Sequence, residues 1–90
     1  MRLEWKPAAF ADRDAIMDRI ALDDPAAAIA LDLEFEAHAE RALAHPTLYK
    51  QGRMRGTREI VIRPNYVMVY CIKGDALAVL RVLHARQQWP

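Results

Sequence analysis

Three arginines alternate with uncharged residues in the segment Gly52–Glu59, whose sequence is GRMRGTRE. The glycines that flank Arg53 and Arg55 permit unusual backbone angles and the close approach of a ligand. Guanidinium groups spaced in this way would project to one side, which suits the binding of phosphates or carboxylates. In the alternative interpretation the segment is an ordinary solvated edge, where Arg58 and Glu59 pair with their neighbours. We favour binding and expect the three arginines to contact a target or a partner protein.

A second group of reactive side chains lies in the C-terminal segment Leu80–Pro90, which reads LRVLHARQQWP. Arg81 falls within an apolar strand, where a charge needs a partner, and Glu59 is the predicted partner. His84 and Arg86 follow at the point where that strand ends. An imidazole beside a guanidinium could carry out acid–base chemistry on an RNA backbone. The same pair could instead bind an acidic surface.

Signatures of the common catalytic sites are absent, because the sequence has no GxSxG, phosphate-binding glycine loop, HExxH or CxxC motif. Cys71 is the only cysteine, so we expect no internal disulfide and no cysteine-bound zinc. His38 is predicted to be solvated on an acidic stretch of helix rather than to bind a metal. His45 precedes Pro46 at a helix end, where hydrogen bonding to the last carbonyls is its expected role. We therefore expect neither a cofactor nor a metal ion.

The small net charge of +1 conceals an asymmetry between the two halves of the chain. Residues 1–45 hold five Lys/Arg and ten Asp/Glu, a net charge of −5, whereas residues 46–90 hold eight and two, a net charge of +6. The basic half points to an anionic partner, either nucleic acid or an acidic protein segment. Alternatively, acidic helices neutralise a basic sheet within one fold. Because no apolar run approaches a membrane span and no secretory signal is visible, we expect a cytoplasmic protein.

The hydrophobic pattern predicts one α+β domain over residues 1–90, because its period changes from helical to two near Pro46. Asp24 and Pro25 are typical of a helix start, so the break between two helices falls there. The expected order is β-α-α-β-β-β, with an N-terminal strand, a helical hairpin and a curved antiparallel sheet. The predicted elements are a strand at 3–5, a helix from Pro7, a helix at 25–44, and strands at 58–62, 66–72 and 76–83.

The second predicted helix carries two apolar stripes on opposite sides. One comprises Ile29, Ala30, Leu33 and Ala37, and the other comprises Ala28, Leu31, Phe35 and Ala42. Both stripes of such a helix need to be buried, one against the sheet and the other against the first helix or a partner chain. A chain of this size buries only about 60% of its unfolded surface, so a partner would stabilise it.

The segments GRMRGTRE, NYVMVYCI and LRVLHARQQWP together resemble the RelE/ParE toxin superfamily, and the resemblance extends over essentially the whole chain. Members are toxins of type II toxin–antitoxin systems, and an antitoxin segment wraps and neutralises each of them. RelE-like toxins cleave messenger RNA in the ribosome with basic residues on the central strands and a C-terminal arginine and tyrosine. ParE-like toxins lack that set and poison DNA gyrase. The resemblance therefore implies a growth inhibitor held by a cognate antitoxin.

The nuclease residues match poorly when they are carried over one at a time. The positions of the strand lysines correspond to Ile60 and Ile62, and the arginine expected after Tyr66 is Val67. Arg86 matches the C-terminal arginine, but no later tyrosine follows. The ending LRVLHAR resembles that of ParE-like toxins. A gyrase poison without enzymatic activity is therefore the favoured interpretation.

Two other interpretations stay open. The first is a ribosome-dependent mRNA endoribonuclease with a rearranged site, in which Arg58, His84 and Arg86 would be catalytic and the other two arginines of the GRMRGTRE segment would assist. The second is a degenerate relative that only binds an antitoxin. For contact with gyrase or the antitoxin we single out Arg53, Arg55, Arg58, Arg86 and Trp89.

Overall fold

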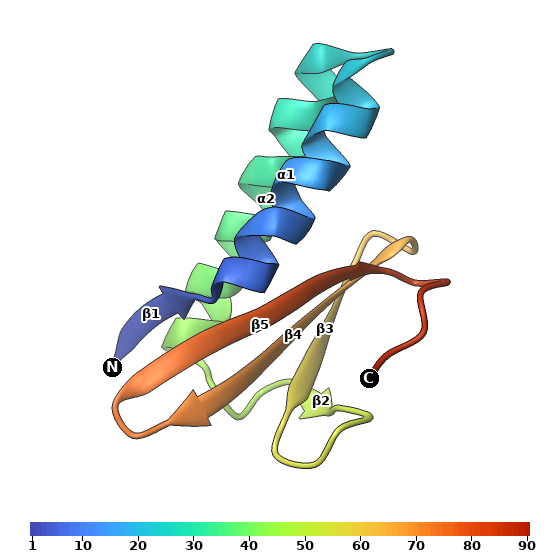
Figure 1. Ribbon diagram of the computed structural model, residues 1–90. Coiled ribbons are helices and arrows are strands. Elements are labelled where there is room, and N and C mark those ends of the chain that lie inside the picture. Colours follow the sequence, from blue (N-terminus) through green and yellow to red (C-terminus); the bar gives the residue numbers. More distant parts are fainter.

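The computed structural model describes all 90 residues and shows two helices against a five-stranded sheet (Figure 1). In chain order the elements are β1 (Arg2–Trp5), α1 (Pro7–Ala21), α2 (Pro25–Ala44), β2 (Lys50–Gln51), β3 (Arg58–Ile62), β4 (Tyr66–Lys73) and β5 (Ala76–His84). The strand order in the sheet is β1-β5-β4-β3-β2. The predicted α+β fold, with its N-terminal strand, helical hairpin and three closing strands, is confirmed.

Two features of the sheet go beyond the sequence prediction. β1 pairs in parallel with β5, and its last residue, Trp5, lies opposite Val79, so the sheet is mixed. β2 is a short extra strand in which Lys50 lies opposite Glu59 of β3. The strands β3, β4 and β5 are antiparallel, as predicted. Because β1 ends opposite Val79, the second half of β5 is an edge whose backbone groups need other partners.

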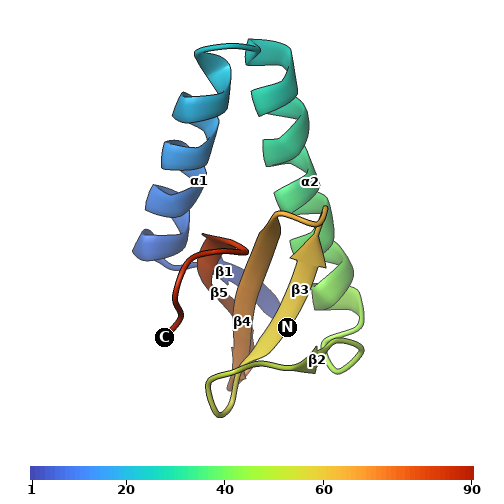
Figure 2. The same ribbon diagram turned by 90° about the vertical axis from the view of Figure 1, so that its right-hand side faces the viewer.

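The two helices form a hairpin that stands over one face of the sheet and extends beyond it (Figures 1 and 2). Asp24 caps α2 by accepting a hydrogen bond from the Ala27 backbone N–H at 3.1 Å. Arg13 of α1 is buried and donates two hydrogen bonds of 2.8 Å to Asp32 of α2, which ties the hairpin together. Neither helix combines the length and the apolar character that a membrane span needs.

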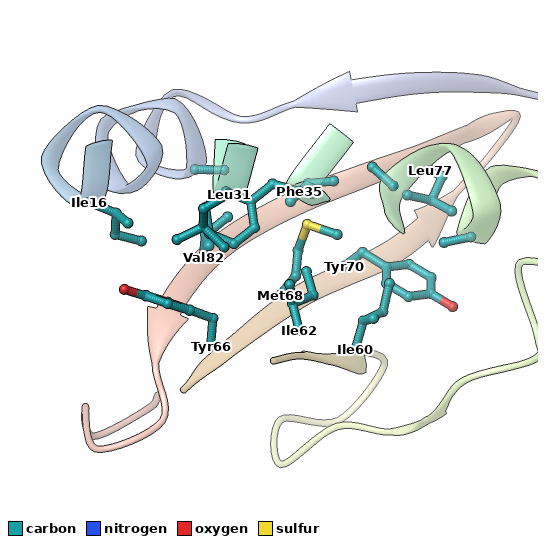
Figure 3. Close-up of a cluster of buried hydrophobic side chains, with 14 residues drawn as sticks. Ile16, Leu31, Phe35, Ile60, Ile62, Tyr66, Met68, Tyr70, Leu77 and Val82 are labelled. Carbon is teal, nitrogen blue, oxygen red and sulfur yellow. The ribbon is translucent and has the colours of Figure 1, made fainter. Parts of the chain in front are cut away.

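The core lies between the hairpin and the sheet (Figure 3). Leu31 and Phe35 of α2 pack on the sheet face that carries Met68 and Tyr70, and each of these side chains is at most 1% exposed. Successive side chains of a strand point to opposite faces, so the residues between these core positions lie on the face without helices. We call this second surface the open face; it contains Val61, Val67, Val69, Leu80 and Leu83.

Only one of the two apolar stripes of α2 is covered. The stripe that contains Leu31 and Phe35 is buried against the sheet. On the other stripe, Ile29 is 52% exposed and Leu33 is 58% exposed. The first helix is one of the two predicted covers for this stripe. That prediction is wrong, because α1 packs beside α2 and leaves its outer face exposed. The outer face of α2 stays available to a partner chain.

Candidate functional site

The loop Gly52–Glu59 is closed on itself by hydrogen bonds. The Glu59 side chain is only 5% exposed, and its Oε2 accepts bonds from the Arg53 backbone N–H at 2.9 Å and from Arg53 Nε at 3.3 Å. Thr57 Oγ1 donates to a backbone carbonyl oxygen within the loop at 2.5 Å. Gly52 is needed at its position because a Cβ there would collide with Thr57 Oγ1. The loop therefore uses Arg53 for its own structure.

The other two arginines of this loop differ in availability. Arg58 Nη1 donates to the carbonyl oxygen of Tyr49 at 2.6 Å and to that of Thr47 at 3.4 Å. Arg58 thereby fixes the connection between α2 and β2. Arg55 is exposed and makes no hydrogen bond or ion pair within the chain. Of the three arginines, Arg55 is therefore the one without a partner within the chain, and binding of a target by this loop stays a prediction.

Arg81 of β5 pairs with Asp12 of α1, so the predicted pairing with Glu59 is wrong. Its Nε and Nη2 donate to the two carboxylate oxygens of Asp12 at 2.7 and 2.9 Å. Asp12 Oδ2 also accepts the Val82 backbone N–H at 2.9 Å, which supplies the partner that β1 does not give to this edge. Val69 lies between Glu59 and Arg81 in the strand register, and the carboxylate of Glu59 bonds to Arg53 instead. Hydrogen bonding to Asp12 raises the pKa of Arg81, which stays charged.

The C-terminal segment places an aromatic cover on the middle of the open face. Trp89 packs against the cluster of Val67, Val69 and Leu83, and its ring centroid lies 5.8 Å from the guanidinium carbon of Arg81. The indole N–H of Trp89 is buried and has no hydrogen-bond partner. At the edge of the same face, Val61 stays 55% exposed. The middle of the open face therefore holds an apolar cluster that the chain itself covers, since Val67, Val69 and Leu83 are at most 8% exposed. Glu59 and Arg81 lie on either side of Val69 in the register.

A hollow of about 420 Å³ lies between α1 and the end of β5, and the residues that line it are Arg19, His84, Arg86 and Gln87. We call it the C-terminal hollow. The His84 backbone N–H donates to Gln87 Oε1 at 2.8 Å, and His84 Nδ1 accepts the Arg86 backbone N–H at 3.2 Å. The side chains of Arg19 and Arg86 make no hydrogen bond or ion pair. The structure thus brings the predicted His84 and Arg86 together. It adds Arg19, which the sequence did not single out because it lies on an ordinary polar face of a helix.

The other two histidines belong to α2 and its C-terminal end. His38 is half-buried and its Nδ1 is buried without a hydrogen-bond partner, so the predicted solvated position is wrong. Burial lowers the pKa of His38, and the charge of Arg41 lowers it further. The backbone N–H of His45, rather than its ring, bonds to the carbonyl oxygens of Arg41 and Ala42. Among the residues that line the C-terminal hollow, His84 is therefore the only acid–base group.

The positions that correspond to strand lysines of RelE-like toxins do not face the open side of the sheet. Ile60 and Ile62 are 2% and 0% exposed and belong to the core under the helices. On the open face, β3 contributes Glu59 and Val61, and β4 contributes Val67, which lies opposite Val61 in the register. Neither strand therefore contributes a basic side chain to the middle of this face.

Solved structures share this arrangement of helices and strands. A chain of a chromosomal ParDE TA system from P. aeruginosa matches with a TM-score of 0.82 and 23% identity, over 93% of this chain and 95% of that chain. A copper-bound mutant toxin from Helicobacter pylori matches with a TM-score of 0.61 and 20% identity, over 94% of both chains. At these identities the similarity defines the fold alone.

Sequence similarity then defines the family. The family model of the ParE toxin of type II toxin–antitoxin systems, parDE, matches residues 3–89. Y4kP of Sinorhizobium fredii is 33% identical over 90 residues, which cover 99% of this chain and 93% of that protein. Toxin RelE2 of Caulobacter vibrioides is 31% identical over 83 residues, which cover 90% and 91% of the two chains. The chain belongs to the ParE toxin family and is the toxin of a type II toxin–antitoxin system.

Proposed function

We propose that this toxin stops growth by binding DNA gyrase and that it is not itself an enzyme. The observation that carries the proposal is the lack of basic side chains from β3 and β4 in the middle of the open face. Ile60, Ile62 and Val67 occupy the positions at which the resemblance to RelE-like toxins would place catalytic basic side chains, and all three are buried and apolar. The LRVLHAR ending, which resembles that of the gyrase-poisoning ParE-like toxins, supports the same target.

The chemistry of RNA cleavage supports this choice. Cleavage needs a base for the 2′-hydroxyl, stabilisation of the phosphorane charge, and an acid for the leaving oxygen. Arg86 could stabilise charge and His84 could transfer one proton, but the hollow that they line offers no second acid–base side chain. The absence of one such group typically costs about 10²–10⁴ in rate. A nuclease that used this hollow as its active site would therefore cleave RNA slowly.

The names of the similar proteins point to both branches of the superfamily. The relative from Caulobacter vibrioides is named Toxin RelE2, whereas the similar structure from P. aeruginosa is of a ParDE system. The names of these proteins therefore do not indicate whether the target of this toxin is RNA or gyrase. The proposal of gyrase as the target rests instead on the side chains of the open face.

We further propose that a cognate antitoxin forms a hetero-oligomer with this toxin and covers the outer face of α2. The family consists of toxins from toxin–antitoxin systems, and an exposed apolar helix face is a common mark of a protein interface. An amphipathic antitoxin helix with anchors at i, i+3, i+4 and i+7 would bury Ile29 and Leu33. Acidic residues elsewhere in the antitoxin would meet Arg55. We place the pair in the cytoplasm, where gyrase lies.

Induction of the toxin alone separates the candidate targets. Growth, the SOS response and the 5′ ends of messages would be followed in the same culture. Gyrase poisoning predicts growth arrest with an SOS response and intact messages. Site-specific message cleavage would overturn the proposal in favour of the endoribonuclease. Normal growth would identify a degenerate relative that only binds its antitoxin.

The antitoxin interface has its own test. Ile29→Asp and Leu33→Asp place a charge on the outer face of α2, so each should weaken binding of the antitoxin about tenfold or more. Leu22→Asp is the matched control, because Leu22 is 85% exposed just beyond the end of α1 and lies outside that face. Calorimetric titration measures the three affinities. Equal affinities for all three variants would contradict docking on α2.

A further inference from the structure

We propose that the C-terminal hollow is a binding site for a phosphate group. Four hollows open on the surface of this protein, and this one alone is lined by neither a carboxylate nor an apolar side chain. The residues that line it are Arg19 of α1, His84 at the end of β5, and Arg86 and Gln87 just beyond that strand. The inference is independent of the gyrase proposal, because it concerns which ligand the hollow holds and not which target the toxin inhibits.

The charge of the hollow is not compensated within the protein. Arg19 and Arg86 both line it, and neither side chain forms an ion pair. The neighbouring hollow contains Asp12, but both oxygens of that carboxylate are occupied by Arg81. Two guanidinium groups that face one space repel each other, and an anion between them replaces that repulsion by attraction. An anionic ligand therefore fits the hollow.

The hydrogen-bonding groups of the hollow are poised to donate. Because His84 Nδ1 accepts the Arg86 backbone N–H, the proton of the neutral imidazole resides on Nε2, which then donates. The Oε1 of Gln87 accepts the His84 backbone N–H, so the amide NH₂ of Gln87 is left to donate. These two groups and the two guanidinium forks offer more donors than the two oxygens of one carboxylate use. The several oxygens of a phosphate match them better.

The lining also argues against an acidic peptide as the ligand. Protein segments that dock on a surface bury apolar anchors at the centre of the contact. No apolar side chain lines this hollow itself, and the apolar Ile16 and Val82 of the adjoining hollow share that hollow with the carboxylate of Asp12, which disfavours an acidic segment. A small hydrophilic group needs no such anchor. Inorganic phosphate, a nucleotide and a nucleic-acid backbone all present this group, and the experiment separates these sources.

The test is an NMR titration of the purified, ¹⁵N-labelled full chain at constant ionic strength. One arm uses inorganic phosphate, a second uses a short oligothymidylate, and a third uses an aspartate-rich peptide. We expect saturable shifts of the Arg19 and Arg86 side-chain N–H signals with a phosphate compound. Arg19→Ala and Arg86→Ala should each weaken that binding about tenfold, the loss of a charge-assisted hydrogen bond. Arg41→Ala is the matched control, because Arg41 is exposed on α2, has no ion pair and lies outside the hollow.

The outcomes are distinct. Saturation by inorganic phosphate at least as tight as by the oligonucleotide supports the site and identifies a small ligand. Tighter saturation by the oligonucleotide supports the site and identifies a nucleic-acid backbone. The proposal is overturned if Arg41→Ala weakens binding as much as Arg19→Ala, since general charge attraction would then explain it. It is also overturned if the aspartate-rich peptide binds more tightly than both phosphate compounds.

Discussion

The loop Gly52–Glu59 and the C-terminal hollow both gather arginines, but only the hollow leaves a pair of them without partners. In the loop, Arg53 donates hydrogen bonds to the buried carboxylate of Glu59, and Arg58 donates to a backbone carbonyl oxygen. In the hollow, Arg19 and Arg86 have no partner within the chain. Arginine content alone would have assigned the loop the greater part in binding. In the structure, the pair of arginines without partners lies in the hollow instead.

The comparison separates two uses of one side chain. An arginine whose hydrogen bonds are already made within the fold contributes to stability, and its removal leaves a buried partner unsatisfied. An exposed arginine without a partner contributes little to stability and keeps its donors for a ligand. Substitutions in the two regions should therefore affect different measurements.

The largest effect is expected for Asp12→Ala, which would turn Arg81 into an unpaired arginine beside the hollow. The Asp12 side chain is 15% exposed and that of Arg81 is 31% exposed. Breaking this partly buried pair, and leaving the Val82 N–H unsatisfied, should lower the free energy of unfolding by about 3 kcal/mol. Urea denaturation measures the change. Asp12→Asn keeps an acceptor and should lose less; a loss under about 1 kcal/mol for Asp12→Ala, the value of a surface pair, would contradict this role.

A smaller loss of stability is expected for Glu59→Ala. The change removes the acceptor of two hydrogen bonds from Arg53 and opens the loop, at a cost of about 2 kcal/mol. Glu59→Gln is the control, because its amide oxygen can still accept the backbone N–H. Thermal unfolding of the three proteins gives the order wild type, Gln variant, Ala variant. If the Ala variant were as stable as the wild type, the loop would not depend on this carboxylate.

Substitutions in the hollow should leave stability almost unchanged. Arg19→Ala and Arg86→Ala remove exposed side chains without partners, so each should change the free energy of unfolding by no more than about 0.5 kcal/mol. Denaturation under the conditions used for Glu59→Ala makes the comparison direct. A loss as large as that of Glu59→Ala would show that the hollow is structural and would remove the contrast between the two regions.

The smallest effect concerns His38, a half-buried residue whose Nδ1 atom is buried without a hydrogen-bond partner. Burial lowers the pKa of His38 from its ordinary value of 6.5, so the unfolded chain takes up a proton there at a higher pH than the folded protein. This contribution to stability is therefore complete above pH 6.5 and declines as the pH falls below it toward the folded-state pKa. His38→Gln should reduce the loss of stability between about pH 7.5 and 5.5. Identical pH profiles for both proteins would contradict the burial of this imidazole.

Much of the fold could be predicted from the sequence because the hydrophobic pattern is local. The capping pair Asp24 and Pro25 marks the helix break, and the change of period near Pro46 marks the start of the sheet. The parallel pairing of β1 with β5 could not be predicted, because it joins the two ends of the chain and leaves no mark on either. β2 escaped prediction because two residues are too few to show an alternating pattern.

The site was less predictable because its partners are distant in sequence. The Arg81 partner depends on strand register, which places Val69 between Arg81 and Glu59 and leaves Asp12 of α1 within reach. Arg19 belongs to no sequence motif, and only the fold shows that it lines the same hollow as Arg86. By contrast, the mismatch with the strand residues of RelE-like nucleases needs no structure, because the resemblance compares residue types position by position along the sequence.

The most direct test of the central claim is a pair of assays on one preparation of the purified toxin. The first measures DNA supercoiling by gyrase, and the second measures message cleavage in a purified translation system. Because β3 and β4 contribute no basic side chain to the middle of the open face, we predict inhibition of supercoiling at toxin concentrations that leave the message intact. Site-specific message cleavage that is abolished by His84→Ala or Arg86→Ala, with supercoiling unaffected, would contradict the gyrase assignment and establish the endoribonuclease.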